Sequence, residues 1–241
     1  MRQHSSVFLL FVRGSIYPVL GLLSVMSVVQ VILFRFAMER GVYQSLEQTI
    51  EASKIHWVFY VAFWVLLGWE NWLDTSSASQ MDYTFHRLQI PAWSIMTWRC
   101  VCSGLWFLSF WLMEGLLVLG LCSWYLDVKG VESGQALLLA CYRSPFLHSL
   151  IPLREWTRWV RNLALAVGLG VTTGGSLGKP QRVQIILSVT CGVVGSVMFI
   201  QPMGSSSSDA LLTVFSLVMA FISVVRWNLR MEEADGDEKE D

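Results

Sequence analysis

Six long apolar stretches, separated by short polar segments, run along the 241-residue chain. A bilayer core is about 30 Å thick, so a helix needs roughly 20 apolar residues to cross it. The pattern therefore predicts an all-α, polytopic membrane protein with six transmembrane helices, plus short interfacial helices between them. The predicted transmembrane helices are residues 15–36, 55–74, 98–126, 159–174, 183–200 and 210–227.

The segments outside these stretches are too short to form a second domain. We predict a cytoplasmic N-terminal interfacial segment over residues 1–14, a six-span domain over 15–227 and an acidic cytoplasmic tail over 228–241. The apolar run at 7–12 has no small-residue cleavage site after it, so we expect no cleavable signal peptide. The acid-rich residues 232–241 favour a solvated, unfolded tail.

Two connecting segments have patterns of their own. Residues 134–152 begin with an apolar run, but Pro145 and Pro152 interrupt the second half of the segment. Because proline frees backbone groups that lipid cannot satisfy, we interpret this segment as an interfacial or re-entrant hairpin and not as a seventh span. Residues 37–56 carry an apolar stripe at helical spacing, which predicts an amphipathic element on the membrane surface.

Composition supports a membrane protein and narrows its function. Hydrophobic residues make up 54% of the chain and charged residues 15%, whereas a soluble domain usually carries about 25% charged residues. The net charge of −1 argues against a nucleic-acid-binding protein, which would carry a basic excess.

The 5 cysteines are an odd number without a CxxC pair, so we expect no disulfide framework. Cys100 and Cys102 could ligate a metal ion, but no two further ligands stand nearby in the sequence. Free thiols that pack as small hydrophobic side chains are the preferred interpretation. The cysteines are Cys100, Cys102, Cys122, Cys141 and Cys191.

Signatures of catalysis are missing from the sequence. The 4 histidines are far apart, and neither H-E-x-x-H nor G-x-S-x-G occurs. Residues 173–180 resemble a phosphate-binding loop, but Thr173 stands where that pattern needs glycine and Pro180 where it needs serine or threonine. We therefore expect no enzyme activity, no catalytic residue, no cofactor and no metal site.

Lysine and arginine set the predicted orientation, because short cytoplasmic loops carry an excess of both. With both termini in the cytoplasm, nine cations lie inside and eight outside, which favours this orientation. The inner group is Arg2, Arg13, Arg87, Arg99, Lys179, Arg182, Arg226, Arg230 and Lys239. The outer group is Arg35, Arg40, Lys54, Lys129, Arg143, Arg154, Arg158 and Arg161.

Glu114 is the most informative polar residue, because it lies near the middle of the third predicted span. Inserting a carboxylate there costs about 2.5–3.5 kcal/mol, so such residues usually face a bundle interior or a cavity. Glu114 is therefore a candidate for a transport path or a proton site. The alternative is a carboxyl that is neutral or bonded to a neighbouring helix for packing. Glu70 and Asp74 are expected to be interfacial.

Ala166, Gly170 and Gly174 form a small-xxx-small stripe in the fourth predicted span. Such a stripe allows close approach of another helix, either within the monomer or at a dimer interface. Three arginines precede it on one helical face, and we expect them to contact lipid headgroups, with acidic partners as the alternative. These are Arg154, Arg158 and Arg161.

The segment 81–99 places aromatic and aliphatic side chains among polar ones, with Pro91 separating two short helical pieces. Its step from Leu88 to Pro91 and the helix after that step resemble the permease subunits of the type 2 ABC transporter superfamily. Residues 143–152 and then 158–162 are similar to small permease-like proteins of Gram-positive bacteria. The resemblance implies that Tyr83, Phe85, Leu88, Ile90 and Trp93 are candidates for docking on an ATPase.

The family implies six spans, cytoplasmic termini and alternating access driven by a separate ABC ATPase subunit. It also implies a second permease copy or paralogue as a partner in the bacterial cytoplasmic membrane. The chain has no nucleotide-binding motif of its own, so we expect an export subunit that depends on that ATPase. The alternative is a non-transport membrane protein with an accessory, sensor or assembly role.

Overall fold

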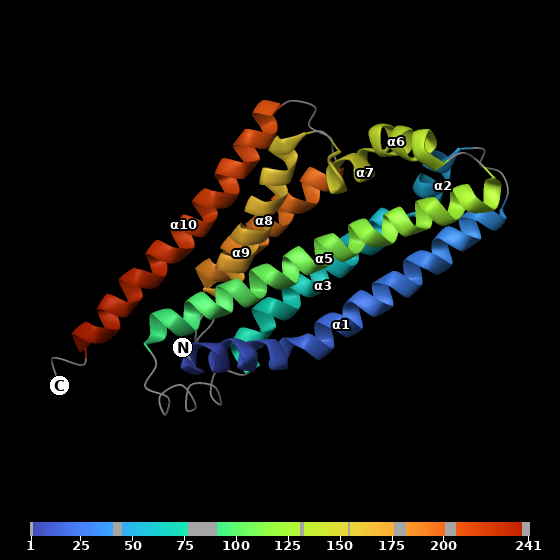
Figure 1. Ribbon diagram of the computed structural model, residues 1–241. Helices are drawn as coiled ribbons and strands as arrows, with labels where there is room; N and C mark the ends of the chain where they lie inside the picture. Colours follow the sequence, from blue (N-terminus) through green and yellow to red (C-terminus); the bar gives the residue numbers. More distant parts are fainter. Residues whose placement is uncertain are drawn as a thin grey trace.

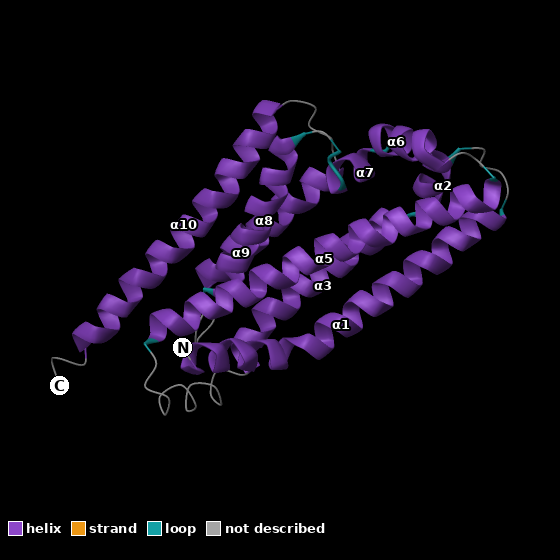
Figure 2. Cartoon of the chain, viewed as in Figure 1, coloured by secondary structure: helices purple, strands orange, loops and turns teal. Residues whose placement is uncertain are grey.

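The computed structural model describes residues 2–40, 45–76, 91–130, 133–153, 155–175, 182–200 and 206–237. These ranges are helical apart from short connections (Figures 1 and 2), so the predicted all-α class is confirmed for them. Nine helices lie in the described ranges: α1 (Arg2–Glu39), α2 (Leu46–Ser53), α3 (Ile55–Ser76), α5 (Ala92–Lys129), α6 (Ser133–Arg143), α7 (Pro145–Leu150), α8 (Trp156–Gly174), α9 (Arg182–Ile200) and α10 (Ser206–Asp237).

Four of the described helices, α1, α5, α9 and α10, are long and apolar enough to cross a membrane. The pair α2 and α3 meets the same criterion only when the two are taken together, and they bend by 45° at their junction. The protein is therefore a polytopic helical membrane protein with four or five candidate spans. Six spans are not confirmed, because α8, which covers the fourth predicted span, is not among the candidates. Its first turns carry the buried polar residues Arg158, Arg161 and Asn162.

The helices form a bundle with α8 at its centre (Figure 1). α8 packs against α5 on one side and α10 on the other, and α1 covers α5 beside α3. The N- and C-termini lie toward the same end of the bundle, and α2, α6 and α7 lie at the other end. The connecting helices α2, α6 and α7 therefore lie together at one end of the bundle.

Close packing at the centre depends on the small-residue stripe. A Cβ added to Gly170 would lie 2.6 Å from the Cα of Gly104 on α5, and one added to Gly174 would lie 2.7 Å from the Cα of Cys100. Gly168 approaches a backbone carbonyl of α10 in the same way, at 3.0 Å. The stripe therefore brings helices together within the monomer, as one of the two interpretations of the sequence predicted.

An aromatic cluster joins four helices near the α7 end of the bundle. The ring of Phe59 on α3 lies 5.1 Å from Phe110 on α5, 5.6 Å from Phe146 on α7 and 5.3 Å from Phe199 on α9, measured between centroids. Such contacts add to the area that each ring buries. The short helix α7 is thereby tied to three of the longer helices.

The segment 134–152, for which the sequence predicted a hairpin and not a span, contains most of the two short helices α6 and α7. α6 has 11 residues and α7 has 6, and both are too short to cross a bilayer. Pro145 opens α7, where its missing N–H costs no helical hydrogen bond. Trp111 of α5 donates to the carbonyl of Leu150 at 3.0 Å, which holds the end of α7 against the bundle.

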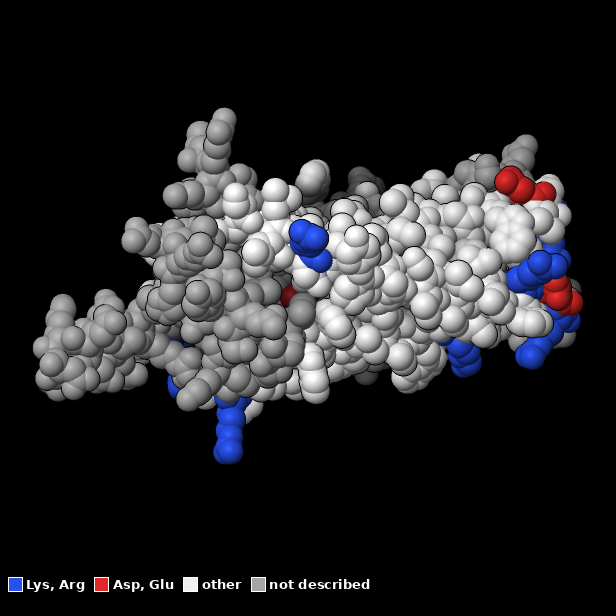
Figure 3. All heavy atoms as spheres, turned by 90° about the horizontal axis from the view of Figure 1, so that it is seen from below, with Lys and Arg blue, Asp and Glu red and all other residues white. Residues whose placement is uncertain are grey.

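The two ends of the chain are more regular than the sequence suggested. α1 continues without a break from Arg2 through the predicted interfacial segment, and Val7 and Phe11 pack against Ile95 and Cys102. α10 extends to Asp237, although the acidic composition favoured an unfolded tail from residue 232. One face of the molecule is nearly free of charge between its ends, and charged side chains gather at the end that bears α2 (Figure 3).

Candidate functional site

Glu114 and Gln30 form a buried polar pair between α5 and α1. Both side chains have no exposed surface. The Gln30 amide Nε2 donates to both carboxyl oxygens of Glu114, at 2.9 and 3.0 Å, and lies 3.5 Å from the carbonyl of Ile55 at the start of α3. The pair therefore joins two candidate spans and reaches a third helix.

This pair suits either protonation state of the carboxyl. The Gln30 amide also offers an oxygen, Oε1, which has no hydrogen-bond partner among the described residues. If the amide rotates, a protonated Glu114 can donate to Oε1 and accept from Nε2 at the same time. The link to α1 is thus compatible with either protonation state of Glu114. The sequence placed Glu114 in a span but did not identify Gln30, whose signal was a lone amide inside an apolar stretch.

Glu70 is not interfacial, contrary to the sequence-based prediction. It is buried, and the hydroxyl of Ser103 on α5 donates to its Oε2 at 2.6 Å. Arg99, one turn before Ser103, is also buried. A side chain near the predicted end of a span is therefore covered by a neighbouring helix. The Asp74 side chain lies outside the described residues.

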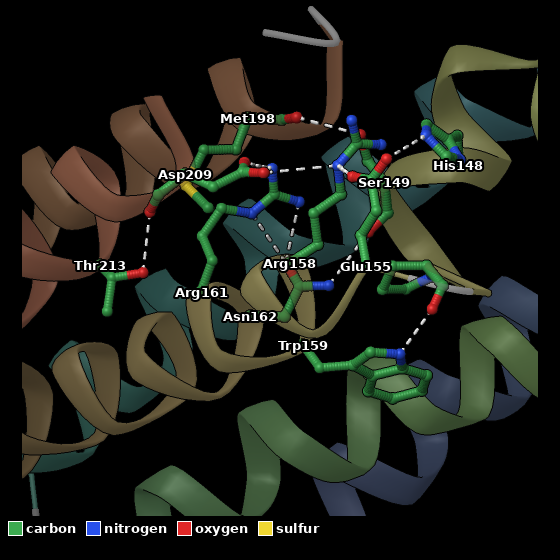
Figure 4. Close-up of polar contacts among 11 residues, drawn as sticks. His148, Ser149, Glu155, Arg158, Trp159, Arg161, Asn162, Met198, Asp209 and Thr213 are labelled. Atoms are coloured by element: carbon green, nitrogen blue, oxygen red, sulfur yellow. Dashed lines mark hydrogen bonds and ion pairs between the residues drawn. The ribbon is translucent and has the colours of Figure 1, made fainter. Parts of the chain in front are cut away.

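A larger group of charged and polar side chains lies where α7, α8, α9 and α10 meet (Figure 4). We call this group the arginine cluster, and it consists of Glu155, Arg158, Arg161, Asn162 and Asp209. Arg161 contacts Asp209 at 2.7 Å, and Arg158 lies 3.5 Å from the other oxygen of Asp209. Arg158 and Arg161 are both buried. The prediction that they contact headgroups was wrong, and the alternative of acidic partners holds for both. Arg154 lies outside the described residues.

Asn162 extends the cluster to the neighbouring helices. Its Oδ1 accepts from Nε and Nη2 of Arg161, at 3.2 and 3.0 Å, and its Nδ2 donates to the carbonyl of Ser149 at 3.0 Å. The Ser149 hydroxyl donates to the carbonyl of Met198 at 3.3 Å. A continuous chain of polar contacts thus links α10, α8, α7 and α9 (Figure 4).

His148 of α7 lies at the edge of the cluster. Its Nε2 is 3.8 Å from Glu155, and Glu155 contacts Arg158 at 2.6 Å. Burial lowers the pKa of His148 below its ordinary value, and the charge of Arg158 lowers that pKa further, against the opposite effect of Glu155. Arg161 and Asp209 add weaker effects of opposite sign. His148 is therefore neutral at neutral pH.

The lowered pKa of His148 predicts that the protein is less stable in acid. The unfolded chain takes up a proton at the ordinary histidine pKa of about 6.5, and the folded protein does so only at lower pH. Stability present at neutral pH is therefore lost as pH falls through that window. We expect the unfolding temperature of the detergent-solubilised protein to fall as the pH drops below about 6.5. His148→Gln should reduce this fall, and an equal fall in both proteins would contradict the assignment.

The predicted docking residues are mostly outside the described part of the chain. Tyr83, Phe85, Leu88 and Ile90 lie in 77–90, and only Trp93, on α5, is described. Its ring is half exposed and packs on Trp227 of α10, with 4.8 Å between centroids. Trp93 and Glu114 are on the same helix, about 30 Å apart along its axis.

The five cysteines are free thiols, and four of them are buried. Among the described residues, no group of three or more histidine, cysteine or acidic side chains is placed to hold a metal ion. Comparison with known proteins found no matching family model, no matching curated protein and no matching solved structure. The candidate functional site is therefore defined by its geometry, with Glu114 and Gln30 at its centre.

Proposed function

We propose that this protein is the membrane-spanning, permease-like subunit of an ABC exporter and works with a separate ATPase. The observation that carries the proposal is the continuity of α5, a 38-residue helix that begins directly after the segment 77–90 and contains Glu114. An ATPase docked on Tyr83, Phe85, Leu88, Ile90 and Trp93 would therefore act on the N-terminal end of α5. The buried carboxyl of Glu114 lies farther along the same helix.

In this proposal, the conformation in which Glu114 is bonded to Gln30 is the closed state of the transporter. A shift of α5 along α1 would separate the carboxyl from the amide, because the two hydrogen bonds of 2.9 and 3.0 Å cross that interface. The separated carboxyl would then have to meet substrate, water or a proton. Alternating access would consist of making and breaking this contact.

A six-span topology belongs to the proposal, with α8 as the additional crossing. Its 19 residues extend about 28 Å, close to the thickness of a bilayer core. Its polar residues are buried against α10 and α7, whereas Val160, Leu163 and Val167 are exposed on its outer face. Termini that lie toward one end of the bundle support the same side of the membrane for both, and the lysine and arginine distribution assigns that side to the cytoplasm in this proposal. A second permease copy or paralogue would complete the exporter.

The accessory, sensor or assembly role is the second candidate. It is favoured by the enclosure of Glu114, whose two oxygens both accept from Gln30 and have no exposed surface. A carboxyl of this kind is also suited to fixing two helices in one position.

The experiment compares the tagged wild-type chain with Glu114→Gln and Glu114→Leu after purification from its native membranes. Wild type should retain ATPase activity, and Glu114→Gln should retain the ATPase but change the pH dependence of its turnover, because the amide cannot take up a proton. Glu114→Leu leaves the buried Gln30 amide without its acceptor and should lower stability by about 1–3 kcal/mol, so the folding of this variant is checked by its unfolding temperature before turnover is compared. Its ATPase turnover should fall, because the contact that couples α5 to α1 is lost.

Glu39→Gln is the matched control, because Glu39 is an exposed carboxyl on α1 whose ion pair within the described residues is with Arg35, at 2.9 Å. It should leave the pH dependence unchanged. A wild-type chain that retains no ATPase would favour the accessory role. If ATPase turnover were the same in wild type, Glu114→Gln and Glu114→Leu at every pH, Glu114 would have no part in the mechanism. The ATPase partnership would still stand.

A further inference from the structure

A hollow of about 330 Å³ lies inside the bend between α2 and α3 and is closed on one side by α7 and the end of α9. Lys54, which joins the two helices, has a left-handed backbone with φ of 56°, and this turns the chain so that α2 folds over the start of α3. The hollow is lined by Ile50, Glu51, Lys54, His56, Trp57, Tyr60, Ser144, Pro145, Phe146 and Phe199.

The rim of this hollow carries one positive and one negative side chain, Lys54 and Glu51, and both are exposed. Within the described part of the chain, neither forms an ion pair. Two opposite charges on one rim that do not neutralise each other are complementary to a ligand that carries both charges.

Aromatic rings form the wall below the two charges. The rings of Trp57 and Tyr60 are 6.1 Å apart and nearly perpendicular, and the ring of His56 lies 6.3 Å from that of Phe146. Tyr60 is more than nine-tenths buried, yet its hydroxyl makes no hydrogen bond to another described residue. Faces of tryptophan and tyrosine attract an ammonium group, and a tyrosine hydroxyl can donate to a phosphate oxygen.

A second hollow, of about 480 Å³, continues from the first along α3. It shares Trp57 and Tyr60 with the first and is otherwise lined by Val61, Trp64, Val65 and Ser196. The distance from Trp57 to Val65 along the helix is about 12 Å. Tryptophan at the end of a span usually lies at headgroup level, so the second hollow is at the depth of the acyl chains.

We propose that these two hollows form one binding site for a zwitterionic phospholipid. The phosphate lies against Lys54 and the Tyr60 hydroxyl, the ammonium lies against Glu51 and the ring of Trp57, and one acyl chain lies along Val61 and Val65. An anionic headgroup fits less well, because it brings a negative charge to Glu51 without a second cation on the rim. The site is independent of Glu114 and of an ATPase.

Native mass spectrometry of the detergent-purified chain tests this site with three probes: phosphatidylethanolamine, phosphatidylcholine and phosphatidylglycerol of the same acyl composition. Both zwitterionic lipids should bind about tenfold more tightly than phosphatidylglycerol, as expected for one additional charged contact. Lys54→Gln and Glu51→Gln should each weaken zwitterionic lipid binding about tenfold. Tyr60→Phe and Trp57→Leu should weaken it less.

Lys129→Gln is the matched control, since Lys129 is an exposed lysine at the end of α5 that does not line either hollow. It should bind all three lipids as wild type does. Equal affinity for the three lipids, or loss of phosphatidylglycerol binding alone in Lys54→Gln, would overturn the proposal. Soluble phosphoethanolamine should not compete at matched concentration, and effective competition would show that the acyl hollow is not part of the site.

Discussion

Asp209→Ala is expected to destabilise the protein by about 3–5 kcal/mol, the usual effect of removing one partner from a buried ion pair. Asp209 is nearly fully buried and contacts Arg161 at 2.7 Å and Arg158 at 3.5 Å. Without its carboxylate, Arg161 would remain buried as a charge without an acidic partner. The measurement is the free energy of unfolding in detergent by chemical denaturation.

Two controls separate this effect from a general loss of charge. Glu39→Ala removes an acid from an exposed pair with Arg35, and pairs of that kind contribute about 0–1 kcal/mol. A double variant, Asp209→Leu with Arg161→Met, removes both charges and should recover much of the loss. An Asp209→Ala protein as stable as Glu39→Ala would contradict a structural role for the arginine cluster.

The longest elements were predictable because lipid imposes a simple requirement on sequence. Every backbone polar group in the hydrocarbon core must be bonded within the protein, so an apolar stretch of sufficient length becomes a helix. α1, α5, α9 and α10 each contain one predicted span, and the prolines of residues 134–152 correctly argued against a further span there, where the short helices α6 and α7 lie. These predictions needed only length, hydropathy and proline.

Positions of polar side chains were less predictable, because burial depends on a neighbour far away in the sequence. Glu70 was assigned to the membrane surface from its place in the span, yet Ser103 of α5 covers it. Arg158 and Arg161 were assigned to headgroups, and their partner Asp209 comes from another helix. The sequence identified the residues that need a partner but not the partner itself.

Glu114 shows the same limit at the candidate site. Its position in the middle of an apolar stretch predicted a buried carboxyl facing the bundle, and the structure places it there with no exposed surface. The bond to Gln30, 84 positions away, arises only from the packing of α1 on α5. The small-residue stripe of α8 was more informative, because its spacing alone specified close contact with another helix, and that contact has its own consequence for stability.

Gly170→Ala should destabilise the protein by about 1–3 kcal/mol, the usual range for overpacked interiors. The added methyl group would lie 2.6 Å from both the Cα and the N of Gly104 and 2.9 Å from the carbonyl oxygen of Cys100. These are backbone atoms, so no side-chain rotation can relieve the contact, and α8 has to move away from α5. Unfolding in detergent measures the effect.

Gly104→Ala, on the other side of the same contact, is the matched control. A Cβ at Gly104 would lie 3.8 Å from the carbonyl oxygen of Ala166 and 3.9 Å from the Cα of Gly170, which are ordinary van der Waals distances. The difference arises from direction, since the Cα–Cβ bond of residue 170 would point at the backbone of α5 and that of residue 104 would point past α8. Gly104→Ala should therefore leave stability unchanged or raise it slightly, because alanine is the better helix former. Equal destabilisation by both substitutions would contradict this geometry.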